Sequence, residues 1–169
     1  KTVSGSQPND VDNNDILCDY AYAVATACDA EVGIVGFGGT GILTAGVGSV
    51  PALPTTYNSI FSGVTRSFSG PAPDLVIYNE GTNDSASITA AFTGVVNAIR
   101  TAAPSSKHLL LIPFNGAHAA ESFSFCSWSG SPYCTSCDTT GWFDGADSSD
   151  GLHPYGYAHL GSIAPKLFP

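Results

Sequence analysis

Two continuous apolar runs, separated by an amphipathic segment, constrain the fold of this chain more than any other feature. Residues 74–79 and 107–113 lack the polar–apolar alternation of half-exposed strands, so we expect strands covered on both faces, as in a parallel sheet. Between them, apolar residues recur at helical spacing over residues 87–102. A strand, a helix and a strand in this order predict an α/β fold with a parallel sheet.

The remaining segments fit one such domain. With 169 residues, of which 43% are hydrophobic and 11% charged, the chain can bury a core of its own. No repeat or linker divides it, so we expect residues 1–169 to form a single domain. The other expected elements are helices at 15–27, 57–61 and 154–167, a buried strand at 31–35, a long loop at 116–141 and an edge strand at 138–142.

The charge balance excludes two classes of partner. The formal net charge is −9, and only five residues are Lys or Arg. A nucleic-acid-binding surface needs basic side chains to neutralise phosphates, so we expect no nucleic-acid partner. No apolar run approaches the roughly 20 residues of a membrane span, so we expect no membrane partner either.

Five cysteines, an acidic composition and few lysines favour a secreted, extracellular protein with disulfides. The alternative is a zinc site that includes Cys134 and Cys137. Such a site needs four ligands, and Cys126 with His118 would complete it only at irregular spacing. Because five is an odd number, we expect one cysteine to pair outside this chain or to remain a thiol.

The segment from Asp150 to Pro154 carries the strongest candidates for catalysis. Asp150 precedes His153 by three residues, a spacing at which its carboxylate can accept a hydrogen bond from His153 Nδ1–H. The ring would then present Nε2 as a general base. Pro154 fits the first position of the following helix, where its missing N–H costs nothing. The alternative is a solvated pair at a helix start.

Two glycine-containing segments follow expected strands. Asn83, in the sequence Gly81-Thr82-Asn83-Asp84, offers a neutral amide donor for a developing oxyanion, or alternatively forms a turn or helix cap. The loop 36–41 can bring the Gly39 N–H close to a substrate, or it is a structural turn. A dinucleotide fingerprint is a poor fit, because Gly and Pro follow the loop and no acidic residue lies about twenty positions on.

Several other residues are weaker candidates. We expect His118 and Glu121, spaced by one helical turn, to form a surface pair; the alternative is that they contact substrate. We expect Glu80 to be a solvated loop acid; the alternative is an acceptor that supports the site. Trp128 and Trp142 would each either contact substrate or pack in the core. We expect His108 and His159 to be structural.

Gly81-Thr82-Asn83-Asp84 and Asp150-Gly151-Leu152-His153 resemble the GxND and DxxH motifs of SGNH (GDSL-type) hydrolases, and the glycine loop is similar to that of secreted fungal carbohydrate-esterase-like members. The resemblance implies a flavodoxin-like three-layer sandwich and a serine esterase that needs no cofactor or metal. His153 would be the base, Asp150 would orient it, and Gly39 and Asn83 would form the oxyanion hole. The implied substrate is an acylated, most simply acetylated, carbohydrate.

Two other functions stay open under this resemblance. The second enzymatic hypothesis is a lipase or thioesterase, which hydrolyses lipid esters or thioesters. The non-enzymatic alternative is a catalytically inactive SGNH-fold protein that acts as a carbohydrate-binding or interaction module.

The GDS block that carries the family's serine is missing from this sequence. In the family that block ends the first strand, which lies between the strands corresponding to residues 31–35 and 74–79. Both of these strands would otherwise have unpaired edges in the middle of the sheet. We therefore expect an upstream fragment of the same protein to supply the central strand and the serine nucleophile.

Overall fold

The computed structural model describes residues 15–61, 63–66, 70–128, 134–148 and 151–167. The chain divides into two units. One, the sheet unit, comprises Val35–Thr140, and the other, the helical unit, comprises Lys1–Ile34 with Gly141–Pro169.

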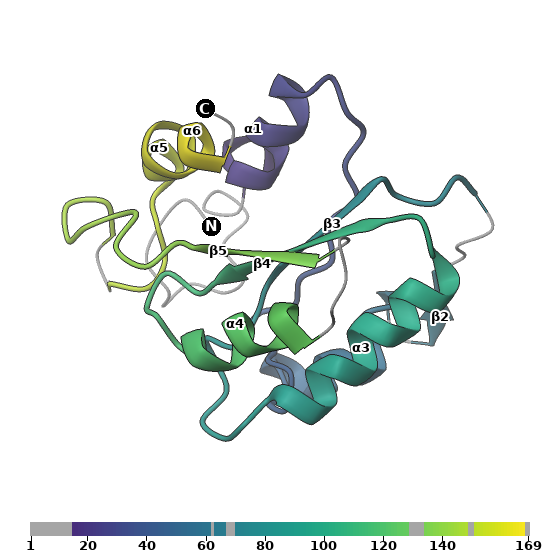
Figure 1. The fold of residues 1–169 in the computed structure, drawn as a ribbon. Coiled ribbons are helices and arrows are strands. Elements are labelled where there is room, and N and C mark those ends of the chain that lie inside the picture. Colours follow the sequence, from purple (N-terminus) through teal and green to yellow (C-terminus); the bar gives the residue numbers. More distant parts are fainter. Residues whose placement is uncertain (1–14, 62, 67–69, 129–133, 149–150, 168–169) are drawn as a thin grey trace. The chain divides into compact units, whose positions relative to one another are not determined.

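The sheet unit contains three parallel strands in the order β3-β4-β5 (Figure 1). These strands are β3 (Leu75–Asn79), β4 (Lys107–Ile112) and β5 (Cys134–Asp138). The β3–β4 register runs from Leu75 opposite Lys107 to Asn79 opposite Leu111. The predicted α/β class with a parallel sheet is confirmed.

Two helices, α3 (Thr89–Ala102) and α4 (Ala119–Trp128), lie on one face of this sheet (Figure 1). The apolar stripe of α3 explains the packing, because Phe92 and Val96 are buried against the sheet. The core that joins helices, strands and loops comprises Ile42, Leu53, Tyr78, Ile88, Phe92, Val96, Leu110 and Phe125.

Short elements connect these parts. They are η3 (Val47–Ser49), α2 (Leu53–Thr56), β1 (Ser59–Phe61) and β2 (Val64–Thr65). β1 and β2 form an antiparallel pair, so the helix expected at residues 57–61 is wrong. The helical turn lies just before that segment, where Pro54 sits in its first turn.

The long loop expected at residues 116–141 is also wrong, because α4 and β5 occupy much of it. The apolar side chains of α4 do not form one buried stripe: Phe125 is buried, whereas Phe123 is 46% exposed. Strand β5 has no run of β-branched residues; it is formed by its backbone pairing with β4. Neither element therefore has a strong signature in the sequence.

The outer strands of the sheet have one partner each. In the described part of the chain β3 and β5 both pair only with β4. The strand expected at residues 31–35 is not formed, and Val32 and Ile34 are each 42% exposed. A strand needs a neighbour for its backbone hydrogen bonds, and the described chain provides none for this segment.

In the helical unit, α1 (Tyr20–Ala27) packs on the C-terminal helical run. That run consists of α5 (Gly156–Ala158), the π-helical turn η4 (His159–Ile163) and α6 (Ala164–Leu167), and η2 (Ile16–Cys18) precedes α1. Asp19 caps α1 by accepting from Ala21 N–H at 2.7 Å. The helices predicted at 15–27 and 154–167 are confirmed in outline. No helix in the described residues is long and apolar enough to span a membrane.

Candidate active site

The GxND segment forms a tight turn directly after β3. Asp84 N–H donates to Gly81 O at 3.1 Å, and Gly81 has a φ of +112°, a conformation that favours glycine. The turn lies beyond the carboxyl end of a parallel strand, the position at which α/β folds bind ligands.

The Asp84 side chain fixes the glycine loop to this turn. It is only 8% exposed, and its carboxylate accepts from the backbone amides of Ile42 at 2.7 Å, Leu43 at 2.8 Å and Thr44 at 3.0 Å. Thr44 Oγ1 donates to the same carboxylate at 3.0 Å. Hydrogen bonds from backbone amides to an ionised carboxylate are stronger than those between neutral groups. This buried cluster therefore holds the glycine loop against the turn.

Gly41 permits this arrangement. A Cβ on Gly41 would lie 2.6 Å from each Asp84 carboxylate oxygen, much closer than real Cβ contacts allow. The close approach of the Asp84 side chain therefore favours glycine at this position, and the glycine loop packs against the buried carboxylate of the turn after β3.

Asn83 is exposed beside the glycine loop. Its Nδ2 donates to Thr40 O at 3.0 Å, and its own carbonyl accepts from Thr44 Oγ1 at 2.9 Å. One amide N–H thus holds the side chain against the loop, and the amide group has a second N–H to donate. Asn83 can therefore take part in the turn and still offer an amide hydrogen to an oxyanion.

Gly39 adjoins the carbonyl that holds Asn83. It is exposed and has a φ of +73°. Thr40 N–H donates to Phe37 O at 3.1 Å, but no bond within the described residues uses the Gly39 N–H. The structure therefore brings the turn that bears Asn83 and the loop that bears Gly39, two of the four predicted site residues, into contact.

His118 and Glu121 form the predicted pair, but the pair belongs to the same cluster instead of being exposed on the surface. The His118 side chain is 11% exposed; its Nδ1 is 2.8 Å from Glu121 Oε1 and its Nε2 is 3.1 Å from Asp84 O. The backbone of His118 has a φ of +55°, and its carbonyl oxygen accepts from Ser122 N–H. The pair therefore lies where α4 begins. The spacing alone did not show that the ring would face the turn after β3.

Glu121 also caps the start of α3. Its Oε2 accepts from Ile88 N–H at 2.9 Å and Thr89 N–H at 3.0 Å, together with the hydroxyls of Ser87 and Thr89. The exposed amides at a helix N-terminus favour an anionic acceptor. Here the acceptor comes from a different helix.

Glu80 is not a solvated acid. Burial, followed by the nearby Asp84 carboxylate, raises the pKa of Glu80 to about 7. Glu80 directly follows β3 and precedes the Gly81–Asp84 turn.

The DxxH segment belongs to the helical unit. Asp150 lies outside the described residues, so its hydrogen bond to His153 stays a prediction. His153 is half-buried. Pro154 does not open the helix, because α5 begins at Gly156, and Tyr155 N–H is held by Asp147 O at 2.8 Å.

The cysteines form no disulfide and no metal cluster among the described residues. Cys134 and Cys137 both lie on β5, and residues three apart on a strand point to opposite faces, so they cannot share one metal ion. Cys126 and Cys134 are neighbours, with 2.6 Å between their Sγ atoms.

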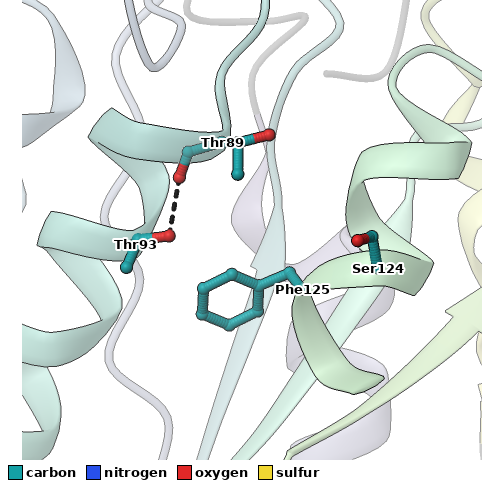
Figure 2. Close-up of a pocket in the computed structure, with 4 residues that line it drawn as sticks. All are labelled: Thr89, Thr93, Ser124 and Phe125. Carbon is teal, nitrogen blue, oxygen red and sulfur yellow. Dashed lines mark hydrogen bonds between the residues drawn. The ribbon is translucent and has the colours of Figure 1, made fainter. Parts of the chain in front are cut away.

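A pocket of about 260 Å³ lies between α3 and α4, apart from the predicted site residues (Figure 2). It is lined by Thr89, Thr93, Ser124 and Phe125. Thr93 Oγ1 donates to Thr89 O at 2.7 Å, and Thr89 Oγ1 donates to Glu121. The lining has no titratable group, and we assign it no chemistry.

Comparison with solved structures defines the class of fold. The chain shares its α/β fold with carbohydrate esterases of family 2, which have the SGNH (GDSL-type) fold, and the predicted resemblance is confirmed at that level. No protein-family model matches the chain, and no curated protein matches it.

Three of these structures illustrate the similarity. A family 2 carbohydrate esterase from Clostridium thermocellum, solved with cellohexaose, has a TM-score of 0.77 at 22% identity. A family 2 enzyme with a carbohydrate-binding domain from Corynascus thermopiles (Myceliophthora fergusii) gives 0.72 at 20%, and an acetyl xylan esterase from Butyrivibrio proteoclasticus gives 0.71 at 17%.

The matches cover 98%, 96% and 92% of this chain, respectively. The chain spans only 57%, 59% and 55% of those three proteins.

Proposed function

We propose that this chain supplies the oxyanion hole and the general base of a carbohydrate esterase that removes acyl groups, with acetyl as the favoured group. One observation carries the proposal: the buried Asp84 carboxylate ties the glycine loop to the turn that bears Asn83. The amide of Asn83 and the N–H of Gly39 are thereby held on two adjoining segments, which suits an oxyanion hole.

The reaction would be acyl transfer through a serine. The serine Oγ attacks the ester carbonyl, and His153 accepts the hydroxyl proton and returns it to the leaving alcohol. Water then attacks the acyl-enzyme with His153 again as base. Asp150 orients the ring, and Asn83 and Gly39 donate to the oxyanion. These roles follow from the motifs and require no cofactor.

The serine would come from a parallel strand that pairs with the open edge of β3. Two features support this placement. β3 has an apolar sequence and no second partner among the described strands, and Leu75 on it is 48% exposed. In the SGNH pattern the strand ending in Gly-Asp-Ser occupies that position. An upstream fragment of the same protein is the proposed source.

The substrate class rests on the solved structures of similar fold. One was solved with cellohexaose and another is an acetyl xylan esterase, so an acetylated plant polysaccharide is the first choice. Lipid esters and thioesters rank second. Secretion fits a polymeric substrate outside the cell, and we propose that the protein is extracellular.

The test uses the intact protein that contains this chain, with acetylated xylan and a serine-directed fluorophosphonate. We expect acetate release and labelling of a serine outside the 169 residues. His153→Ala should reduce both by several orders of magnitude, because the serine loses its base. If the protein binds xylan oligosaccharides but neither releases acetate nor is labelled, the esterase proposal is wrong. The alternative, an inactive carbohydrate-binding protein, would then be supported.

A further inference from the structure

The His118 ring lies between two acceptors. Its Nδ1 is 2.8 Å from Glu121 Oε1, and its Nε2 is 3.1 Å from the Asp84 carbonyl oxygen. A peptide carbonyl and an ionised carboxylate can only accept hydrogen bonds. Both contacts are therefore hydrogen bonds only when both ring nitrogens carry protons, which makes the ring a cationic imidazolium.

The neighbours keep Glu121 an acceptor. Burial by itself raises the pKa of Glu121, but hydrogen bonds from His118, Thr89, Ser87 and the Ile88 amide outweigh it and lower the pKa to about 2. The carboxylate is therefore ionised at neutral pH and cannot donate a proton to His118 Nδ1.

The charged groups that face the ring favour its cationic form. Glu121 approaches it from α4 and Asp84 from the segment after β3, and Glu80 lies beside Asp84. The hydrogen bond that His118 donates to Glu121 raises the pKa of His118; burial opposes this, and the bond to the Asp84 carbonyl adds to the rise.

We propose that His118 is a positioning residue that holds the Gly81–Asp84 turn in the conformation that presents Asn83, and that it does so only while its ring carries both protons. The inference rests on the proposed function, because it takes Asn83 as an oxyanion donor.

Three contacts make this coupling direct. The ring holds the carbonyl of Asp84, the residue that follows Asn83. Gly81, at the start of the turn, packs against the ring so closely that a Cβ there would lie 3.1 Å from His118 Cδ2. Through Glu121, the same ring is connected to the first amides of α3. Loss of the ring charge would loosen the turn from both helices.

The pH dependence has a definite sign. Because the folded-state pKa of His118 is raised, its contribution is fully present below the ordinary histidine value, about 6.5, and is lost as pH rises through the raised value. We therefore expect the pH profile of activity to have an alkaline limb that is set by His118.

The first measurement does not depend on activity. The chain has four histidines, and nitrogen NMR of the ¹⁵N-histidine-labelled intact protein distinguishes imidazolium from neutral rings. His118→Gln identifies the signals of His118. We expect both His118 nitrogens to be protonated at pH 7 and to titrate above the ordinary histidine range. A neutral His118 ring at pH 7 would overturn the inference.

The second measurement is the pH profile of kcat and KM for an activated acetyl ester. Glu121→Gln keeps an acceptor oxygen but removes the charge, so the alkaline limb should move to lower pH. Glu31→Gln removes the same charge at an exposed site and should leave the limb in place. His118→Gln should abolish the limb and lower kcat about 10-fold, less than the 10²–10³ typical of a lost oxyanion donor, with little change in KM.

An alkaline limb that is the same in wild type and Glu121→Gln would contradict the positioning role, and this variant suffices if His118→Gln does not fold. If the wild-type protein hydrolyses no ester, the proposed function fails. The NMR measurement then decides the charge on His118 by itself.

Discussion

At the scale of single residues, three histidines show how neighbours set the charge on one side-chain type. His108 is buried with Nδ1 2.9 Å from Tyr78 Oη, and burial lowers its pKa. His159 accepts from Tyr20 N–H at 3.2 Å, so its Nδ1 carries no proton, and burial lowers its pKa too. His118 has an acceptor within hydrogen-bond distance of each ring nitrogen, whereas Asp19 Oδ2 lies 3.6 Å from His159 Nδ1. His108 and His159 are buried, and His118 contacts the turn that bears Asn83.

The close contact between Gly41 and Asp84 gives a prediction for stability. In Gly41→Ala the new methyl group must displace the Asp84 carboxylate from its three amides. We expect a loss of about 2–3 kcal/mol in the free energy of unfolding, typical of overpacking a buried site, measured by urea denaturation. Gly36→Ala is the control, since a Cβ there meets nothing within 4 Å. Equal stability of the two variants would show that Asp84 is not held as described.

At the scale of elements, the contacts that shape the site link segments far apart in sequence. α4 supplies the cap of α3 through Glu121, and the turn after β3 supplies the anchor of the glycine loop through Asp84. β5 begins beside the last turn of α4, where Cys134 meets Cys126.

The proximity of Cys126 and Cys134 predicts a disulfide under oxidising conditions. A small-molecule disulfide would accept two electrons and two protons from the thiols and leave as two thiols. The bond would close a short loop and stabilise the fold by about 2 kcal/mol. Peptide mapping after oxidation should find this pair, and Cys126→Ser should abolish it. Recovery of both residues as thiols, or of either one joined to Cys137, would contradict the pairing.

The strongly periodic elements were predictable, and the site contacts were only partly so. β3, β4 and α3 follow from continuous apolar runs and an apolar stripe, because burial itself creates those patterns. α4 and β5 lack such a pattern and depend on their neighbours. The motifs gave Asn83 and Gly39, but the anchoring role of Asp84 appears only when its backbone partners, some forty residues away, are folded against it.

At the scale of the whole molecule, the chain spans 57% of the Clostridium thermocellum enzyme, and β3 pairs only with β4 among the described strands. The sequence predicted a further strand beside β3, because apolar runs do not form stable edges in water. The proposed activity is therefore tested on the intact protein that contains this chain.

The central claim, that the turn after β3 bears an oxyanion donor, is tested most directly by the kinetics of Asn83→Ala in the intact protein. Asn97→Ala, at an exposed position of α3, is the matched control. With an activated acetyl ester, we predict that kcat falls by about 10²–10³ in Asn83→Ala with little change in KM, because the donor acts in the transition state. The control should match wild type. If Asn83→Ala keeps the kcat of Asn97→Ala, Asn83 is not an oxyanion donor and the proposed site is wrong.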